Sequence, residues 1–314
     1  MTVSPDSTAE REKNSAALSS VAAAVALTSF KIIVGLLTGS LGILAEAAHS
    51  GLDLVAALVT FFAVRLSGKP ADSEHPYGHG KIENLSALFE TLLLLVTCVW
   101  IIYEAIQRLF IETVHVDASI WAFIVMGISI VIDYGRSRVL YRAARKHNSQ
   151  ALEADALHFS TDIWSSSVVI LGLLGVRLAG FFPGLSFLNQ ADAVAALGVA
   201  LIVVYVSLQL GKRTVAALLD SAPAGLSEKI KAAVEAIPEV VDCHQIRIRP
   251  SGPSTFIDIH VSVNGEKTLS EAHSLTEVIE QAIQSVSPGA DVTVHPEPVF
   301  SRPGEPQQEP QSLQ

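Results

Sequence analysis

Two histidine–aspartate pairs with identical spacing lie inside apolar stretches of the chain. His49 and Asp53 are four residues apart in the apolar run 41–64, and His158 and Asp162 repeat that spacing in a second run. On a helix, residues four apart lie on one face. Ionisable side chains inside a membrane span cost about 2.5–3.5 kcal/mol each, so they usually have a function. Two imidazoles and two carboxylates form the donor set of a tetrahedral divalent metal site; Zn²⁺ matches best, and Fe²⁺, Co²⁺ and Cd²⁺ match less well.

Hydrogen bonding between helices is the alternative interpretation of these four residues, because polar side chains in helix bundles often bond one another. Two matching pairs, with two carboxylates to neutralise a dication, favour the metal. An acidic residue also stands three positions before each histidine, at Glu46 and Asp155. The two predicted helices cross the membrane in opposite directions, so the match could reflect an inverted repeat with the site at its interface.

A second candidate metal cluster lies in a polar loop with the sequence DSEHPYGHGK. Asp72, His75 and His79 supply a carboxylate and two imidazoles, which suit Zn²⁺. Pro76 and Gly78 rule out a regular helix here, so the three side chains could converge in a compact loop. A solvated polar turn explains the same composition equally well.

The composition indicates that these residues belong to a membrane protein. Half of the 314 residues are hydrophobic and only 17% are charged, which is typical of chains with membrane spans. The formal net charge of −10 argues against a nucleic-acid partner. No apolar stretch opens the chain, so a cleaved signal peptide is not expected. Cys98 lies in an apolar stretch and Cys243 in a polar one, so we expect no structural disulfide between them.

Several apolar segments approach the ~20 residues that cross a bilayer core of ~30 Å. These predicted spans are residues 16–37, 41–64, 85–109, 119–140, 156–178 and 190–211. Lysine and arginine residues concentrate before the first span, between the second and third, between the fourth and fifth, and after the sixth. By the positive-inside rule, both termini of this multi-pass protein are cytoplasmic.

After Pro223 the sequence predicts a soluble α+β domain. The stretches 226–237 and 270–286 carry apolar residues at helical spacing. The alternating stretches that predict strands are 243–249, 256–263 and 291–295. The order helix, strand, strand, helix, strand is typical of a ferredoxin-like layer with its helices on one sheet face.

The predicted fold class is an α-helical membrane protein, a six-transmembrane-helix bundle with a C-terminal α+β ferredoxin-like (αββαβ) cytoplasmic domain. The predicted parts are a polar N-terminal tail (1–14), the transmembrane domain (15–213), a linker (214–222), the cytoplasmic metal-binding and dimerisation domain (223–298) and a disordered tail (299–314). The last of these is rich in Pro, Glu and Gln, which disfavours a packed core.

Motifs, spans and soluble domain together resemble the cation diffusion facilitator family of metal/proton antiporters, above all its bacterial zinc and ferrous-iron efflux members. The resemblance covers roughly residues 14–298 and rests on His49-x-x-x-Asp53, His158-x-x-x-Asp162 and the loop HPYGHGK. It implies a homodimer in the bacterial inner membrane, with transport at the four intramembrane residues and a second metal site in the loop. Many bacterial members carry Asp at the position of His49, and the His form is associated with zinc preference over cadmium.

The same resemblance implies metal at the dimer interface of the cytoplasmic domain. The matching residues here are His244, His260, His273 and His295. Strand alternation points His260 and His295 away from the apolar face, but His244 falls in phase with Ile246. Glu297 stands where the family has a bridging Asp, and its longer side chain could serve the same purpose.

We therefore expect a secondary transporter that exports Zn²⁺, or else Fe²⁺, Cd²⁺ or Co²⁺, in exchange for protons. Its expected partners are divalent metal ions, protons, membrane lipid and a second copy of the chain. Histidine titrates near pH 6.5 and a neighbouring carboxylate can hold a second proton, so protons and metal compete for the site.

Two other classes of protein use similar residues. An intramembrane zinc-dependent hydrolase could employ Glu46 or Asp155 as a base, but it needs an open metal position, which four protein ligands do not leave. A metal sensor anchored in the membrane would need no intramembrane ligands. The sequence therefore predicts a transporter and not an enzyme.

Overall fold

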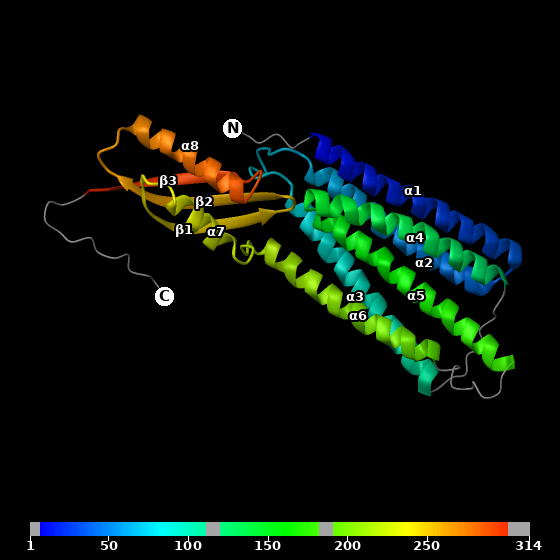
Figure 1. The fold of residues 1–314 in the computed structure, drawn as a ribbon. Coiled ribbons are helices and arrows are strands. Elements are labelled where there is room, and N and C mark those ends of the chain that lie inside the picture. Colours follow the sequence, from blue (N-terminus) through cyan, green and yellow to red (C-terminus); the bar gives the residue numbers. More distant parts are fainter. Residues whose placement is uncertain (1–6, 111–119, 182–190, 301–314) are drawn as a thin grey trace. The chain divides into compact units, whose positions relative to one another are not determined.

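The computed structural model describes residues 7–110, 120–181 and 191–300, which form two compact units. The first unit consists of long helices that run side by side (Figure 1). In the described residues these are α1 (Ser7–Thr38), α2 (Leu41–Ser67), α3 (Lys81–Phe110), α4 (Ile120–His147), α5 (Gln150–Phe181) and α6 (Ala191–Leu218). Each contains the described part of one predicted apolar segment.

Four helical stretches among the described residues are long and apolar enough to cross a membrane. They are Thr8–Thr38, Leu41–Ser67, Lys81–Gln107 and Leu197–Leu218. The other two long helices, α4 and α5, pack against them: α4 lies against α1, and α5 lies against α3 and α6. Large apolar side chains such as Leu37 and Val96 remain exposed on the helices, as expected for a surface that faces lipid.

The helices associate most extensively in the pairs α1 with α2, α4 with α5, and α3 with α6. Small residues permit close approach: a Cβ at Gly211 of α6 would lie 3.2 Å from the Thr91 side chain of α3. Helix α5 contacts α2, α3, α4 and α6. A polar side chain on the inner face of α5 therefore meets partners from several helices.

The first and last of these helices extend beyond the predicted limits of the transmembrane domain, 15–213. Helix α1 begins at Ser7, within the predicted N-terminal tail, because Lys13 is only 3% exposed and its Nζ lies 2.8 Å from Glu83 Oε1. A polar sequence can thus be helical where an ion pair anchors it. Helix α6 continues to Leu218, so the first part of the predicted linker 214–222 is also helical.

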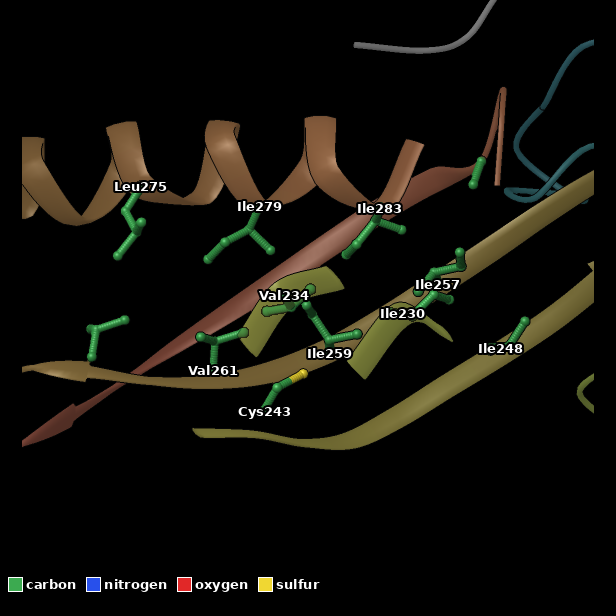
Figure 2. Packing of buried hydrophobic residues seen from close by; sticks show 12 residues of the cluster. Ile230, Val234, Cys243, Ile248, Ile257, Ile259, Val261, Leu275, Ile279 and Ile283 are labelled. Atoms are coloured by element: carbon green, nitrogen blue, oxygen red, sulfur yellow. The ribbon is translucent and has the colours of Figure 1, made fainter. Parts of the chain in front are cut away.

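The second unit has the order αββαβ that the sequence predicts. Its elements are α7 (Leu226–Glu235), β1 (Val240–Ser251), β2 (Ser254–Asn264), α8 (Leu269–Val286) and β3 (Asp291–Val299). The strand order is β1-β2-β3, and α8 connects the parallel strands β2 and β3. Figure 2 shows Ile230 of α7, Ile259 of β2 and Ile279 of α8 meeting in one core. Both helices therefore cover the same face of the sheet.

The start of α8 has the sequence signature of a capping box. Thr268 Oγ1 accepts a hydrogen bond from the Glu271 amide at 3.3 Å, and Glu271 Oε2 accepts one from the Thr268 amide at 2.8 Å. The hydrogen bond from the Thr268 backbone lowers the pKa of Glu271 below its ordinary value. The helix is thus held at the point where the chain leaves β2 for the crossover.

Candidate metal centres

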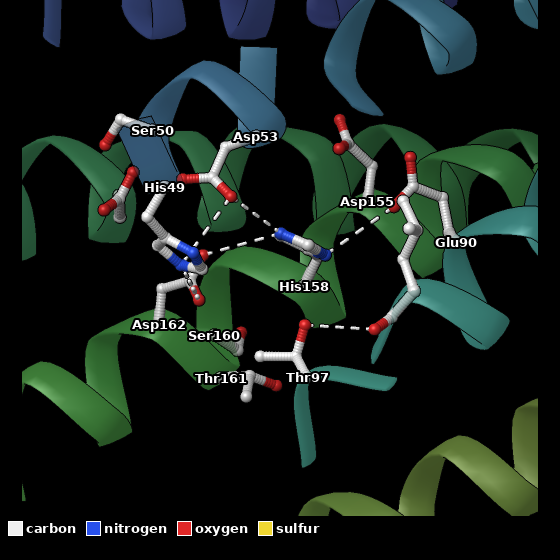
Figure 3. Close-up of polar contacts among 12 residues, drawn as sticks. His49, Ser50, Asp53, Glu90, Thr97, Asp155, His158, Ser160, Thr161 and Asp162 are labelled. Atoms are coloured by element: carbon white, nitrogen blue, oxygen red, sulfur yellow. Dashed lines mark hydrogen bonds and ion pairs between the residues drawn. The ribbon is translucent and has the colours of Figure 1, made fainter. Parts of the chain in front are cut away.

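Helices α2 and α5 bring the four predicted intramembrane ligands together (Figure 3). His158 Nε2 lies 3.2 Å from Asp53 Oδ1 and 3.7 Å from Asp162 Oδ2. His49 Nε2 lies 3.8 Å from Asp162 Oδ1 and 3.9 Å from Asp53 Oδ1. Donor atoms at ~2.0–2.1 Å from a tetrahedral metal are about 3.3 Å apart, so small side-chain shifts would complete a site.

The cluster contains two carboxylates, and because they are buried they need a compensating cation. Asp53 and His158 are 8% and 5% exposed, and Asp162 Oδ2 is buried without a hydrogen-bond partner among the described residues. Buried carboxylates without a compensating cation are costly. The His49 side chain is 42% exposed, so the cluster is open on the His49 side and closed around His158.

The acidic residues that precede the two histidines have different partners. Glu46 Oε2 lies 3.2 Å from Lys31 Nζ on α1, and the same amine donates a hydrogen bond to Ser50 Oγ at 2.8 Å. Asp155 is fully buried, and its Oδ2 accepts a hydrogen bond from Ser20 Oγ of α1 at 3.3 Å. Both acids therefore contact α1: Glu46 forms an ion pair with the Lys31 amine, and Asp155 accepts a hydrogen bond from the Ser20 hydroxyl.

Sequence reasoning missed one residue at this centre. Glu90 of α3 is fully buried, and its Oε2 lies 3.7 Å from His158 Nδ1. Its other oxygen accepts a hydrogen bond from Thr60 Oγ1 at 3.3 Å. No ligand spacing points to Glu90, because it lies on a third helix. Its one sequence signal is that it is a lone acid inside an apolar segment.

The loop between α2 and α3 gathers Asp72, His75 and His79 into a compact cluster. The His75 and His79 rings lie 4.3 Å apart, and Asp72 carboxylate oxygens lie 3.3 Å from His75 Nδ1 and 3.5 Å from His79 Nε2. Gly78 has a φ of 75°, which lets the loop fold back. The His75 amide donates to Asp72, and this hydrogen bond lowers the pKa of that carboxyl. The three side chains are close enough to share a metal.

A third cluster lies on β1, β2 and β3. The parallel register sets His260 beside His295 and Ser262 beside Glu297. The two Glu297 oxygens reach different histidines, one at 2.7 Å from His260 Nδ1 and one at 3.3 Å from His244 Nε2. His295 Nε2 lies 4.0 Å from Glu297. The hydrogen bond with His260 lowers the pKa of Glu297.

His244 reaches this cluster because the strand alternation breaks next to it. Gln245 has a φ of 49°, a left-handed conformation that shifts the phase of β1. Cys243 and Ile248, an odd and an even position, therefore both face the core (Figure 2). His244 is left on the opposite face, where its Nδ1 lies 3.0 Å from Asp242 Oδ2. Asp242 is a second residue that sequence reasoning missed.

His273 lies outside the group formed by His244, His260 and Glu297 among the described residues. It is on α8, with its side chain 73% exposed and its Nε2 3.8 Å from Glu277 Oε1. Helix α8 covers the apolar face of the sheet, whereas the cluster lies on the other face. Within one copy of the chain, the sheet separates His273 from the other histidines.

Long helices with apolar surfaces, clustered metal-binding side chains and a small α/β domain define a membrane protein that binds cations. Residues 17–219 match the family model described as "Cation efflux transmembrane domain", and residues 223–299 match "Cation efflux protein, cytoplasmic domain". The chain belongs to the cation efflux family, which is the cation diffusion facilitator family that the motifs resemble. The predicted family and fold class are confirmed.

Two relatives that match over most of the chain agree with this assignment. The "Cation-efflux pump FieF" of Salmonella arizonae is 34% identical over 291 residues, covering 92% of this chain and 94% of the relative. The pump of the same name from Yersinia enterocolitica is 34% identical over 293 residues, covering 92% and 94%. Among solved structures, the "Metal-bound C-terminal domain of CzcD transporter from Thermotoga maritima" is 34% identical, covers 23% of this chain and 86% of that one, and has a TM-score of 0.22. The protein is a cation efflux transporter of the membrane and not an enzyme.

Proposed function

We propose that the protein exports Zn²⁺ from the cytoplasm in exchange for protons. The observation that carries the proposal is the convergence of His49, Asp53, His158 and Asp162, with the Nε2 atom of each histidine within 3.9 Å of both carboxylates. Two carboxylates neutralise a dication in surroundings of low dielectric constant, and two imidazoles supply the nitrogen ligands that Zn²⁺ favours. Fe²⁺ is the next choice for the same set of ligands.

The same four side chains explain exchange with protons. Imidazoles and carboxylates bind either a metal ion or protons, so loading one releases the other. If the site faces one side of the membrane at a time, this competition becomes antiport. His49 is the most exposed of the four side chains, and we propose that an ion enters the site past His49 while His158 stays enclosed.

We further propose that both termini are cytoplasmic and that the protein works as a homodimer. The orientation rests on the lysine and arginine residues that flank the helices at that end, such as Arg142 and Arg145 of α4. The dimer is supported by the exposure of His273, a predicted ligand that lies apart from its own chain's cluster. A second copy is one source of such a ligand.

The loop and sheet clusters fit Zn²⁺ that stays bound. Asp72 faces two histidines in the loop, and Glu297 faces His244 and His260 on the sheet. Both groups offer nitrogen and carboxylate donors close enough to share one ion. Bound Zn²⁺ would cross-link the segments that carry these side chains, and so would stabilise the cytoplasmic domain and the loop.

Purified protein in sealed vesicles tests the proposal. Zinc uptake is measured with and without an imposed pH gradient, and proton movement is followed with a pH-sensitive dye inside the vesicles. We expect zinc and protons to move in opposite directions, and zinc flux to rise with the gradient. A zinc flux that does not change with the pH gradient and is accompanied by no proton movement would exclude antiport. Vesicles that show no flux of any divalent ion would exclude the proposed transport site.

A further inference from the structure

Two buried polar atoms face each other at the edge of the four-residue site. Glu90 is fully buried on α3, and its Oε2 makes no hydrogen bond with the described residues. His158 Nδ1 is also buried and without a hydrogen-bond partner. The two atoms lie 3.7 Å apart, and Figure 3 shows Glu90 on the side of His158 away from Asp53. A shift of a few tenths of an ångström would make this a hydrogen bond.

The two nitrogens of His158 therefore have different surroundings. Nε2 faces Asp53 and Asp162 at 3.2 and 3.7 Å, and Nδ1 faces Glu90. A neutral imidazole carries its proton on one nitrogen and a lone pair on the other. A metal among the four ligands needs the lone pair on Nε2, so the proton must be on Nδ1, beside the Glu90 carboxylate.

A third helix holds Glu90 in this position. Thr60 of α2 is fully buried and donates a hydrogen bond from Oγ1 to Glu90 Oε1 at 3.3 Å. That bond occupies one carboxylate oxygen and leaves the other for His158. Thr60 and Asp53 are two helical turns apart on α2, so the contacts form a ring through α2, α3 and α5.

We propose that Glu90 is a positioning residue for cation transport. It accepts the Nδ1 proton of His158 in a hydrogen bond, fixes the tautomer, and turns Nε2 toward Asp53 and Asp162. A carboxylate behind a metal-bound histidine both orients the ring and makes it a better ligand. The inference rests on the proposed four-residue transport site. It adds a contribution from α3, whereas the ligands themselves lie on α2 and α5.

The first test compares variants of two equally buried glutamates on α3. Full-length protein with the loop and sheet ligands removed (Asp72→Ala with Glu297→Ala) is titrated with Zn²⁺ against a competing chelator. Glu90→Leu should weaken zinc affinity about 10–100-fold, the usual effect of losing such a partner. Glu90→Gln keeps an acceptor oxygen, so it should recover most of this loss. Glu83→Gln is the matched control: its partners lie away from the site, so it should lower the melting temperature without a comparable loss of zinc affinity.

A double-mutant cycle then asks whether Glu90 acts through His158. In the background of His158→Ala, Glu90→Leu should have no further effect on zinc affinity, because the group that Glu90 orients is gone. An undiminished effect in that background would show that Glu90 binds the metal directly or acts by charge alone, and it would overturn the proposal. Wild-type zinc affinity in Glu90→Leu would overturn it equally.

Nitrogen NMR of histidine-labelled protein provides a readout that needs no Glu90 variant to fold. With zinc bound, His158 should show a metal-bound Nε2 and a protonated Nδ1; a metal-bound Nδ1 would refute the inference. Asp162→Ala separates this test from the proposed function. If Asp162→Ala abolishes flux and Glu90→Leu leaves zinc affinity unchanged, only the inference falls. If Asp162→Ala transports normally, the transport site itself is wrong.

Discussion

Two buried glutamates on α3, seven residues apart and on the same face, have opposite surroundings. Both are fully buried. Glu83 accepts hydrogen bonds from Lys13 Nζ at 2.8 Å, from Ser67 Oγ at 2.9 Å and from the Ser149 hydroxyl. Glu90 accepts one from Thr60 and leaves its other oxygen without a hydrogen bond among the described residues.

The difference separates a structural centre from the proposed transport centre. Around Glu83 a fixed cation neutralises the carboxylate, and the contacts join α1, α2, α3 and the connection between α4 and α5. Around Glu90 lie His158 and two further acids, Asp53 and Asp162, and the ion-pair partners of these acids among the described residues are histidines, which are charged only when protonated. A buried acidic cluster of this kind is stable when a mobile cation or protons occupy it.

The largest effect should come from removing a carboxylate of the acidic centre. Asp162→Ala leaves a bound dication under-neutralised in surroundings of low dielectric constant, so zinc flux should fall to background. Because we propose Asp162 as a ligand and not as a packing element, the protein should still fold and dimerise. Vesicle flux and size-exclusion chromatography measure the two outcomes; near-normal flux would show that this centre is not the transport site.

The centre around Glu83, where Lys13 neutralises the carboxylate, should show the opposite result: a loss of stability with zinc affinity retained. Lys13→Ala removes the fixed cation and leaves Glu83 buried without it, which typically costs about 3–5 kcal/mol of stability. Thermal unfolding in detergent should show a large drop in melting temperature, and protein that remains folded should keep its zinc affinity.

Replacing both members of this pair, Lys13→Met with Glu83→Leu, should recover part of the lost stability because no buried charge remains. A melting temperature as low as that of Lys13→Ala would argue that the pair does not stabilise the bundle through charge. Loss of zinc affinity in either folded variant would mean that the two centres are not separable.

A milder substitution at the acidic centre tests whether His49 sets the metal preference. His49→Asp replaces a nitrogen ligand with an oxygen and adds a negative charge, so zinc transport should continue while discrimination against Cd²⁺ weakens several-fold. Parallel flux assays with Zn²⁺ and Cd²⁺ give the ratio. An unchanged ratio would show that His49 does not set metal preference.

The smallest effect is expected at Glu271, whose carboxylate accepts hydrogen bonds but is exposed to solvent. The pKa of Glu271 is lowered by the hydrogen bond from the Thr268 backbone. A carboxylate with a lowered folded-state pKa contributes stability above its ordinary value of 4.5, and the contribution disappears as the pH falls through the folded-state pKa. Glu271→Gln should therefore lower the melting temperature of the cytoplasmic domain slightly at pH 7 and have no effect at strongly acid pH.

Loss of the whole cap gives a reference for that small effect. Thr268→Ala removes the hydroxyl acceptor and should cost about 1 kcal/mol. Both variants are compared by thermal unfolding across a pH series. A difference between Glu271→Gln and the wild type that does not change with pH would show that the carboxylate's charge is unimportant to the cap.

Features that depend on neighbours along the chain could be predicted from the sequence. The spacing of His49 with Asp53 and of His158 with Asp162 already places each pair on one helical face, because helix geometry is the same wherever a helix forms. The αββαβ order followed from apolar periodicity for the same reason. The sequence permits two interpretations of the loop cluster, because spacing alone does not say whether Asp72 folds back on His75.

Features that depend on contacts between distant segments were decided by the tertiary structure. Glu90 meets His158 only because α3 packs against α5, and no sequence interval records that packing. His244 joins the sheet cluster through one left-handed residue, Gln245, which a rule of strict alternation does not foresee. His273 is separated from that cluster because α8 lies on the other face of the sheet. The sequence by itself determined which candidate ligands are paired within a helix, and the packing of helices and strands decided which further residues stand beside them.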